Sequence, residues 1–100
     1  MVHYRILFIV NPISGFGLGW EIPYRLRHIA AYKDIEYNIR FTEYAGHAKE
    51  IVEQAKHQNY THIIAAGGDG TVNEIGTALI NTGIAFGVIS LGSGNGFARH

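Results

Sequence analysis

A single aspartate stands among glycines in the sequence GGDGTVNEI, residues 67–75. The apolar segment 61–66 before it predicts a short buried strand, and the residues after it have helical spacing. A carboxylate in such a strand-to-helix loop can organise Mg²⁺ or accept a proton, so Asp69 is the candidate catalytic residue. In the structural alternative, Asp69 only stabilises the loop through an Asx-turn.

The residues that follow Asp69 also have two interpretations. Thr71 as the N-cap and Glu74 as its partner would form a capping box, which needs no ligand. The free backbone N–H groups at the same helix N-terminus would attract phosphate. We expect both features, namely a capped helix whose N-terminus faces a binding crevice.

The rest of the sequence alternates strand and helix patterns and predicts the elements that position this loop. Strands are expected over residues 4–10, 35–41, 61–66 and 84–91. Helices are expected over about 22–32, 48–55 and 72–81. This order favours parallel strands joined by right-handed crossovers, which gives an α/β three-layer sandwich of the doubly wound kind. Residues 35–41 alternate apolar and polar side chains, which is typical of an edge strand.

Glycine-rich loops follow three of the four expected strands. They are NPISGFGLG at 11–19, GGDGT at 67–71 and LGSGNG at 91–96, whereas TEYAGHA follows the second strand at 42–48. Each glycine loop alone could serve only a tight turn. Because parallel strands end at one edge of a sheet, however, all four loops should meet there, where open α/β sheets bind ligands.

The familiar nucleotide motifs do not fit these loops. Glycines 15, 17 and 19 run G-x-G-x-G instead of the dinucleotide pattern G-x-G-x-x-G, and no lysine is present for a P-loop. Any phosphate must therefore be held by backbone amides and hydroxyls. The six histidines have no ligand spacing, so the sequence assigns no metal ligands. We expect His47 to cap or pack at the start of its helix.

Composition limits the class of protein. The 100 residues suit one domain, and their formal net charge of +0 gives no bulk attraction to nucleic acid. The absence of cysteine excludes a disulfide scaffold and fits a reducing compartment. No segment approaches the roughly 20 apolar residues of a membrane-spanning helix. These features favour a cytoplasmic globular domain.

Taken together, the four loops resemble the nucleotide-binding half of the diacylglycerol kinase catalytic domain, as in bacterial lipid kinases and sphingosine kinases. NPISG resembles the family's Asn-Pro-x-Ser-Gly loop, and Thr42 with GHA resembles its Thr…Gly-His-Ala segment. GGDGTVNEI is similar to the family signature, and LGSGNGFAR to its Gly-Thr/Ser-x-Asn-x-x-Ala-Arg loop. The four motifs occur in the family's order and cover nearly the whole chain.

The resemblance implies an NAD kinase/diacylglycerol kinase-like fold and an ATP-dependent lipid kinase. Such an enzyme transfers the γ-phosphate of Mg-ATP to the hydroxyl of a diacylglycerol or a long-chain base, with ATP and Mg²⁺ as cofactors. Residues 1–100 would be its N-terminal nucleotide-binding part, and a β-rich domain outside the chain would bind the lipid. We expect this fragment alone to be inactive. The implied enzyme is cytoplasmic, with peripheral contact at the inner membrane surface, and the sequence leaves a homodimer open.

Carried over by position, the resemblance assigns nucleotide contacts to two sets of residues. The first set is Asn11, Pro12, Ile13, Ser14, Gly15 and Thr42. The second set is Gly67, Gly68, Asp69, Gly70, Thr71, Val72, Asn73, Glu74, Gly92, Ser93, Gly94 and Asn95. Asp69 is similar to the essential aspartate of the family, which is viewed as a base in some relatives and as an organiser of Mg-ATP in others.

The chain departs from the family pattern at two places. Phe16 and Gly17 stand where a basic residue often follows the first glycine loop, which leaves phosphate neutralisation to Mg²⁺ or to groups outside the chain. Gly96 replaces an aspartate that is common in relatives, so their acceptor preference does not carry over.

Two other functions stay open on the sequence. An NAD kinase shares Gly-Gly-Asp-Gly-Thr, but its Asn-Glu pair comes well downstream, whereas Asn73 and Glu74 follow the motif directly here. A non-catalytic nucleotide-binding module is the alternative from a different class.

Overall fold

The computed structural model describes residues 3–13, 17–30 and 35–90. The strands are β1 (Tyr4–Val10), β2 (Ile35–Phe41), β3 (His62–Gly67) and β4 (Ala85–Ser90). The helices are α2 (Ile22–Ala30), α3 (His47–Ala55) and α4 (Asp69–Ala78), and a 3-10 turn, η1 (Leu18–Glu21), precedes α2. The predicted alternation of strands and helices is confirmed. The extension of the first predicted helix to residue 32 lies outside the described residues.

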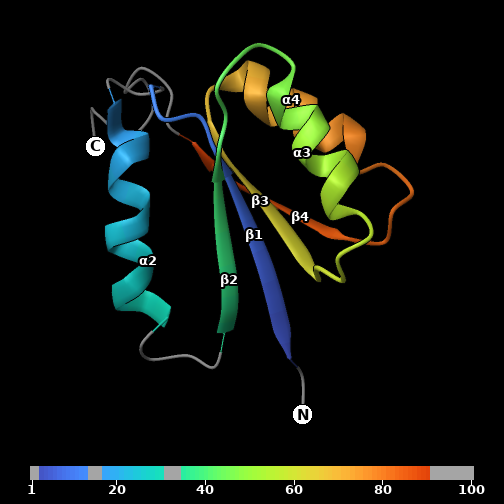
Figure 1. Ribbon diagram of the computed structural model, residues 1–100, viewed down its shortest axis with the longest axis horizontal. Helices are drawn as coiled ribbons and strands as arrows, with labels where there is room; N and C mark the ends of the chain where they lie inside the picture. The colour runs from blue at the N-terminus through green and yellow to red at the C-terminus, as the bar shows by residue number, and fades with distance from the viewer. Residues whose placement is uncertain (1–2, 14–16, 31–34, 91–100) are drawn as a thin grey trace.

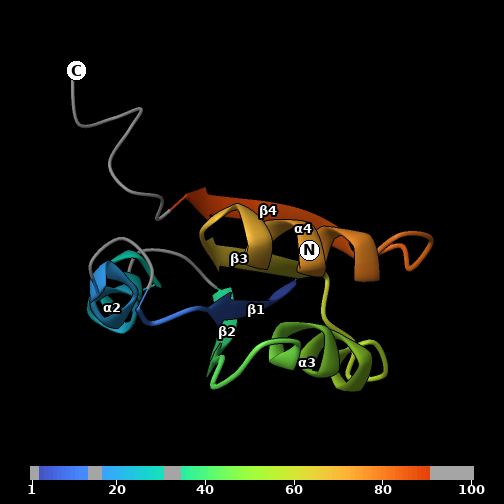
Figure 2. The same cartoon turned by 90° about the horizontal axis from the view of Figure 1, so that it is seen from above.

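The four strands form one parallel sheet in the order β2-β1-β3-β4. From β1 the chain moves outward to β2, and then returns across β1 to β3 and β4. Right-handed crossovers that run in opposite directions place their helices on opposite faces of the sheet. Accordingly, α2 covers one face while α3 and α4 cover the other (Figures 1 and 2). The predicted doubly wound, three-layer sandwich and the edge position of β2 are confirmed.

Each face of the sheet has its own hydrophobic core, because alternate side chains of a strand point to opposite faces. Leu7, Ile9 and Ile63 pack on the face that α3 and α4 cover. The predicted apolar stripe of α3 is buried there, and consists of Ala48, Ile51, Val52 and Ala55. On the other face, Phe8 and Val10 pack with side chains of α2, namely Ile22 and Leu26.

Helix α4 begins earlier than the sequence pattern predicts. Its first residue is Asp69, its N-cap is Gly68 in an extended conformation, and no side chain caps it. Thr71 therefore lies inside the first turn, and the predicted capping box of Thr71 and Glu74 is wrong. The physical reason is tertiary, since the carboxylate of Glu74 instead accepts a hydrogen bond from the backbone N–H of Lys49 at 3.2 Å. Glu74 thus caps the first turn of the neighbouring helix α3.

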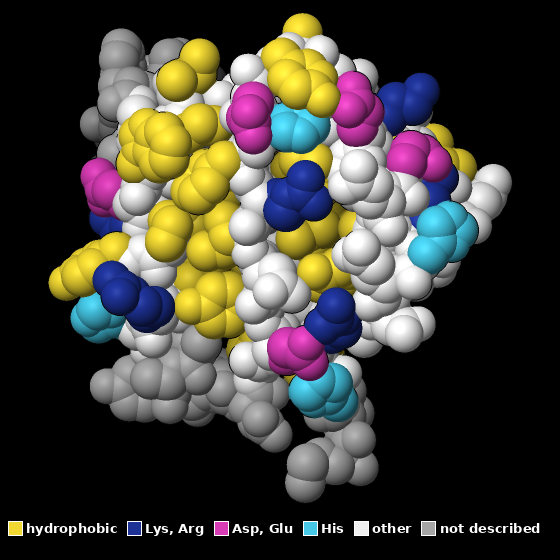
Figure 3. Space-filling model, in the orientation of Figure 1, with side chains coloured by type: hydrophobic (Ala, Val, Ile, Leu, Met, Phe, Trp, Pro, Cys, Tyr) yellow, Lys and Arg dark blue, Asp and Glu magenta, His cyan; other side chains and the backbone are white. Residues whose placement is uncertain are grey.

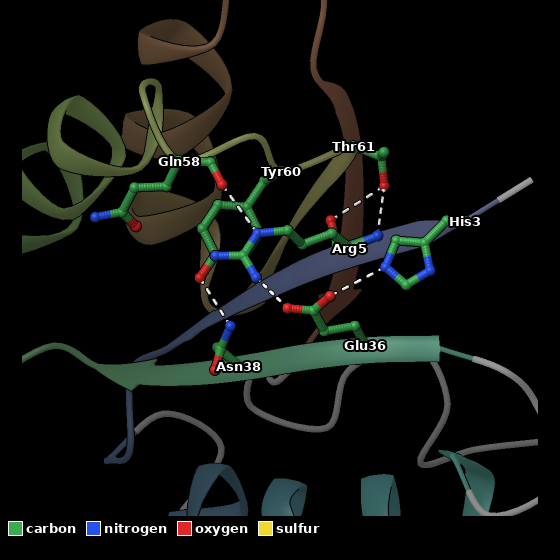
Figure 4. A network of polar contacts seen from close by, with 7 residues as sticks. All are labelled: His3, Arg5, Glu36, Asn38, Gln58, Tyr60 and Thr61. Carbon is green, nitrogen blue, oxygen red and sulfur yellow. Dashed lines mark hydrogen bonds and ion pairs between the residues drawn. The ribbon is translucent and has the colours of Figure 1, made fainter.

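A polar network around Arg5 ties the amino ends of the strands together (Figure 4). The Nε–H of Arg5 donates to the carbonyl oxygen of Gln58 at 2.9 Å, and its guanidinium lies 4.5 Å from the ring centre of Tyr60. Arg5 also pairs with Glu36 of β2, which has a second contact at 3.0 Å to Nε2 of His3. These contacts join β1, β2 and the loop before β3 at the end of the sheet opposite the glycine loops.

We predict that the contribution of Glu36 to stability depends on pH. The hydrogen bond with His3 and the charge of Arg5 hold the pKa of Glu36 below its ordinary value of 4.5. A carboxyl whose pKa is lowered by folding stabilises the protein above its unfolded pKa and loses that effect as the pH falls through its folded pKa. The stability difference between the native chain and Glu36→Gln, measured by urea unfolding, should therefore shrink below pH 4.5. An equal difference at neutral pH and at about pH 3 would contradict this account of Glu36.

Candidate functional site

The loops after β1 and β3 meet at the carboxyl edge of the sheet. These two strands are neighbours, but their connections leave toward opposite faces, to α2 and to α4. The backbone N–H of Asn11 donates to the carbonyl oxygen of Ala66 at 2.9 Å, which holds the two loops side by side. Open α/β sheets have a ligand-binding crevice at such a topological switch point. The structure thus brings two of the four predicted loops together.

Two glycines allow this close approach. A Cβ at Gly67 would lie 3.0 Å from Cβ of Thr71 and 3.3 Å from Cβ of Asn11. A Cβ at Gly19 would lie only 2.6 Å from the carbonyl oxygen of Asn11 and 2.8 Å from Cα of Pro12. The segment after β1 is therefore packed between Gly67 on one side and Gly19 on the other. A Cβ at Gly19 would collide with backbone atoms, and a Cβ at Gly67 would be in unusually tight contact with the side chains of Thr71 and Asn11.

A pocket of about 540 Å³ opens beside this junction. Its walls include six of the residues that the resemblance assigned, which are Asn11, Pro12, Ile13, Thr42, Thr71 and Glu74. The loop after β2 forms another wall, and it is anchored to β1 because the N–H of Thr42 donates to the carbonyl oxygen of Val10 at 2.9 Å. Three predicted loops therefore contribute to one pocket.

Asp69 occupies the first position of α4 and is exposed. A carboxylate there is favourable for the helix because it lies beside the positive end of the helix dipole. Asp69 does not line the pocket itself, but it belongs to the same helix turn as Thr71, which does.

The other assigned residues are distributed differently. Gly68 and Gly70 flank Asp69 with open space where a Cβ would stand. Val72 packs partly against the core on the α3 side, and Asn73 lines a shallow groove between α3 and α4. The remaining assigned residues lie outside the described part of the chain, and they are Ser14, Gly15, Gly92, Ser93, Gly94 and Asn95.

The sequence interpretation missed an aromatic wall of the pocket. Trp20 of η1 lines the pocket and is 61% exposed, while its ring packs against Phe41 with 4.8 Å between centroids. The only signal in the sequence is that the single tryptophan of the chain directly follows a glycine-rich loop. Its contact with Phe41, the last residue of β2, joins segments that no local pattern connects.

The loop after β2 supplies a second aromatic side chain, Tyr44. Its ring stacks on His47 with 4.3 Å between centroids, and its hydroxyl donates to the carboxylate of Glu50 at 2.6 Å. That hydrogen bond raises the pKa of Tyr44 above its ordinary value. His47 also accepts a hydrogen bond at Nδ1 from the backbone N–H of Glu43 at 2.9 Å. The prediction that His47 serves the start of its helix through packing is confirmed.

Within residues 3–13, 17–30 and 35–90, no group of three or more His, Asp or Glu side chains could hold a metal ion. Across the same part of the chain, every helix is too short or too polar to traverse a lipid bilayer.

Known proteins resemble the chain in sequence and in structure. The diacylglycerol kinase catalytic domain family matches residues 5–100. The diacylglycerol kinase of Staphylococcus aureus (strain JH9) is 41% identical over 100 residues, which cover 95% of the chain and 31% of that protein. The probable lipid kinase YegS-like of Klebsiella pneumoniae (strain 342) is 41% identical over 66 residues, or 64% of the chain and 22% of that protein.

Solved structures agree with this assignment. A diacylglycerol kinase from Bacillus anthracis str. Sterne superimposes on 99% of the chain with a TM-score of 0.75 and 29% sequence identity, and the match covers 37% of that structure. The chain thus spans less than two fifths of each of these relatives. The resemblance carried by the four loops is confirmed, and the chain belongs to the diacylglycerol kinase catalytic domain family.

Proposed function

We propose that the chain is the nucleotide-binding part of an ATP-dependent lipid kinase, which transfers the γ-phosphate of Mg-ATP to the hydroxyl of a diacylglycerol or a long-chain base. The observation that carries the proposal is the junction at Gly67, where the loop after β1 and the N-terminus of α4 meet beside a pocket of about 540 Å³. The names of the relatives, diacylglycerol kinase and probable lipid kinase, support the same class of reaction.

The N-terminus of α4 supplies the groups that would hold phosphate. The first hydrogen bond within the helix runs from the N–H of Val72 to the carbonyl oxygen of Gly68 at 3.1 Å. The backbone N–H groups of the preceding three residues, 69–71, therefore have no partner in the helix. Among the described residues there is open space where a Cβ of Gly68 or Gly70 would stand, so a ligand can approach the backbone there. Free N–H groups and the positive helix end together form a site for an anion.

Asp69 fits an ion that arrives with the nucleotide. Mg²⁺ commonly binds to proteins through one or two carboxylates and completes its octahedron with phosphate oxygens and water. A cage of three side chains is therefore not needed, and the exposed carboxylate of Asp69 beside the phosphate-binding turn would hold the ion. Bound Mg²⁺ would neutralise the phosphate charge, because the sequence of the four loops contains no lysine or arginine. We assign Asp69 to this role, and proton acceptance from the substrate hydroxyl is the alternative role for the same residue.

Phosphoryl transfer requires this half of the enzyme to position the nucleotide and stabilise its charge, and requires no covalent chemistry from its side chains. Most of the catalytic effect in such reactions comes from positioning and from electrostatic stabilisation of the transferring group. The chain's own residues would bind and orient the triphosphate, and the acceptor lipid would be bound by a β-rich second domain outside these residues. The kinase would then contact the inner membrane surface through that domain, while residues 1–100 stay on the cytoplasmic side.

We predict that a full-length protein carrying this chain phosphorylates a lipid. Incubation with labelled ATP, Mg²⁺ and a panel of diacylglycerols and long-chain bases should give a labelled lipid product. Asp69→Asn should lower the rate by about 100-fold or more, because a charged group that organises the transition state is lost. Glu53→Gln, which changes an exposed carboxylate on α3 away from the pocket, is the matched control. Labelling of NAD with no lipid product would contradict the proposal and support the NAD kinase alternative.

We also predict that Gly67→Ala damages both stability and nucleotide binding. The new Cβ would press on Thr71 and Asn11, and overpacking of this kind costs about 1–3 kcal/mol of unfolding free energy. Urea unfolding and calorimetric titration with Mg-ATP measure the two effects. Gly68→Ala is the control for stability, since its backbone is at φ −85° and ψ −174° and its added Cβ would stand in open space among the described residues. Equal unfolding free energies for the two variants would show that the close approach at Gly67 does not constrain the fold.

A further inference from the structure

Trp20 lines the pocket with a large aromatic side chain that packing within the described residues leaves mostly exposed. Its ring is 61% exposed, although burial of an indole is strongly favourable. Figure 3, in the orientation of Figure 1, shows a broad apolar surface between α2 and the sheet. Trp20 lies at the carboxyl-edge end of this region, because it lines the pocket beside the loop after β1.

The position of Trp20 is fixed by contacts on two sides. Its ring packs against Phe41 with an interplanar angle of 35° and 4.8 Å between centroids. Its chain neighbour Gly19 is in close contact with the backbone of Asn11 and Pro12, so η1 is held against the loop after β1. A rigid aromatic ring that keeps most of its surface free is suited to stacking on a planar ligand.

The pocket joins Trp20 to the phosphate-binding turn. Thr71 of α4 lines the same pocket, so an anion at the helix N-terminus and a planar group on Trp20 can belong to one molecule. Tyr44, the other aromatic side chain of the wall, is less suited to stacking, since its ring is stacked on His47 and its hydroxyl is bonded to Glu50. A nucleoside triphosphate has the required combination of a flat aromatic base at one end and phosphates at the other.

We propose that Trp20 is the nucleobase-binding residue of this pocket, and that its indole ring stacks on the adenine of ATP. This inference rests on the proposed function and makes it more specific, because it assigns the base to the η1 side of the pocket and the phosphates to the α4 side. Stacking of a base on an aromatic side chain is favourable enough to change affinity by about tenfold. The contact tolerates different bases, and it affects binding of the base without affecting binding of the phosphates.

The chain carries its own reporter for this proposal. It contains one tryptophan, so all indole fluorescence of the 100-residue chain comes from Trp20. Titration with millimolar Mg-ATP or adenosine should quench this emission, because the base stacks on the indole. Magnesium tripolyphosphate, which has no base, should bind without quenching.

Variants separate a stacking role from a structural one. By calorimetric titration, Trp20→Leu should weaken Mg-ATP binding by about tenfold and leave tripolyphosphate binding within about twofold, whereas Trp20→Phe should keep most of the ATP affinity. Tyr24→Leu is the matched control, since Tyr24 is an aromatic side chain of α2 with 60% exposure that does not line the pocket. Circular dichroism of each variant checks that the fold is retained.

Several results would overturn the inference. Unchanged ATP affinity in Trp20→Leu would contradict the stacking role of Trp20 without contradicting the proposed function. An equal loss of ATP and tripolyphosphate affinity in that variant would show that Trp20 only supports the loop. Quenching by anionic phosphatidylglycerol vesicles, with none by ATP, would assign the ring to a lipid surface. If no nucleotide binds to the chain or to a full-length protein that carries it, the inference fails together with the proposed function.

Discussion

The close approach of Asn11 and Thr71 to the backbone of Gly67 is the constraint on which the candidate site depends. There the last residue of β3 lies so near Asn11 and Thr71 that an added Cβ would be 3.3 Å or less from both. The hydrogen bond from the N–H of Asn11 to the carbonyl of Ala66 fixes the same junction from the side of the sheet. As a result, the loop after β1 and the first turn of α4 lie side by side, and a side chain at residue 67 would have to displace the side chain of Asn11 or Thr71.

The two ends of the sheet are stabilised by different kinds of interaction. At the amino end, charged and aromatic side chains join the strands, with Arg5 bonded to the carbonyl of Gln58, paired with Glu36 and placed over Tyr60. At the carboxyl end, close contacts at glycines and backbone hydrogen bonds join the segments that follow the strands. At this carboxyl end, α4 begins without a side-chain cap, so the backbone N–H groups of its first turn have no partner within the helix. Helix N-termini of this kind suit phosphate, which they bind through their free N–H groups.

Local patterns predicted most of the architecture but not the tertiary contacts of the site. The alternation in Ile35–Phe41 and the apolar stripe of α3 each arise because a single element packs one of its faces against the rest of the protein. Both could therefore be predicted from residue spacing alone. The pattern Thr-x-x-Glu suggested a capping box, yet Glu74 bonds to Lys49 of another helix, and that choice depends on how α3 and α4 pack. Trp20 was missed for the same reason, since its place in the pocket depends on Phe41 at the far end of β2.

The central claim is that the junction at Gly67 binds the phosphates of a nucleotide through backbone amides. The most direct measurement is an amide NMR titration of the ¹⁵N-labelled chain with Mg-ATP. The account predicts that the largest shifts occur at Asn11, Ile13 and residues 68–71, with little change at Arg5 and Thr61 at the opposite end of the sheet. Shifts that are absent from both loops while ATP is bound, or that centre on the Arg5 network, would contradict it.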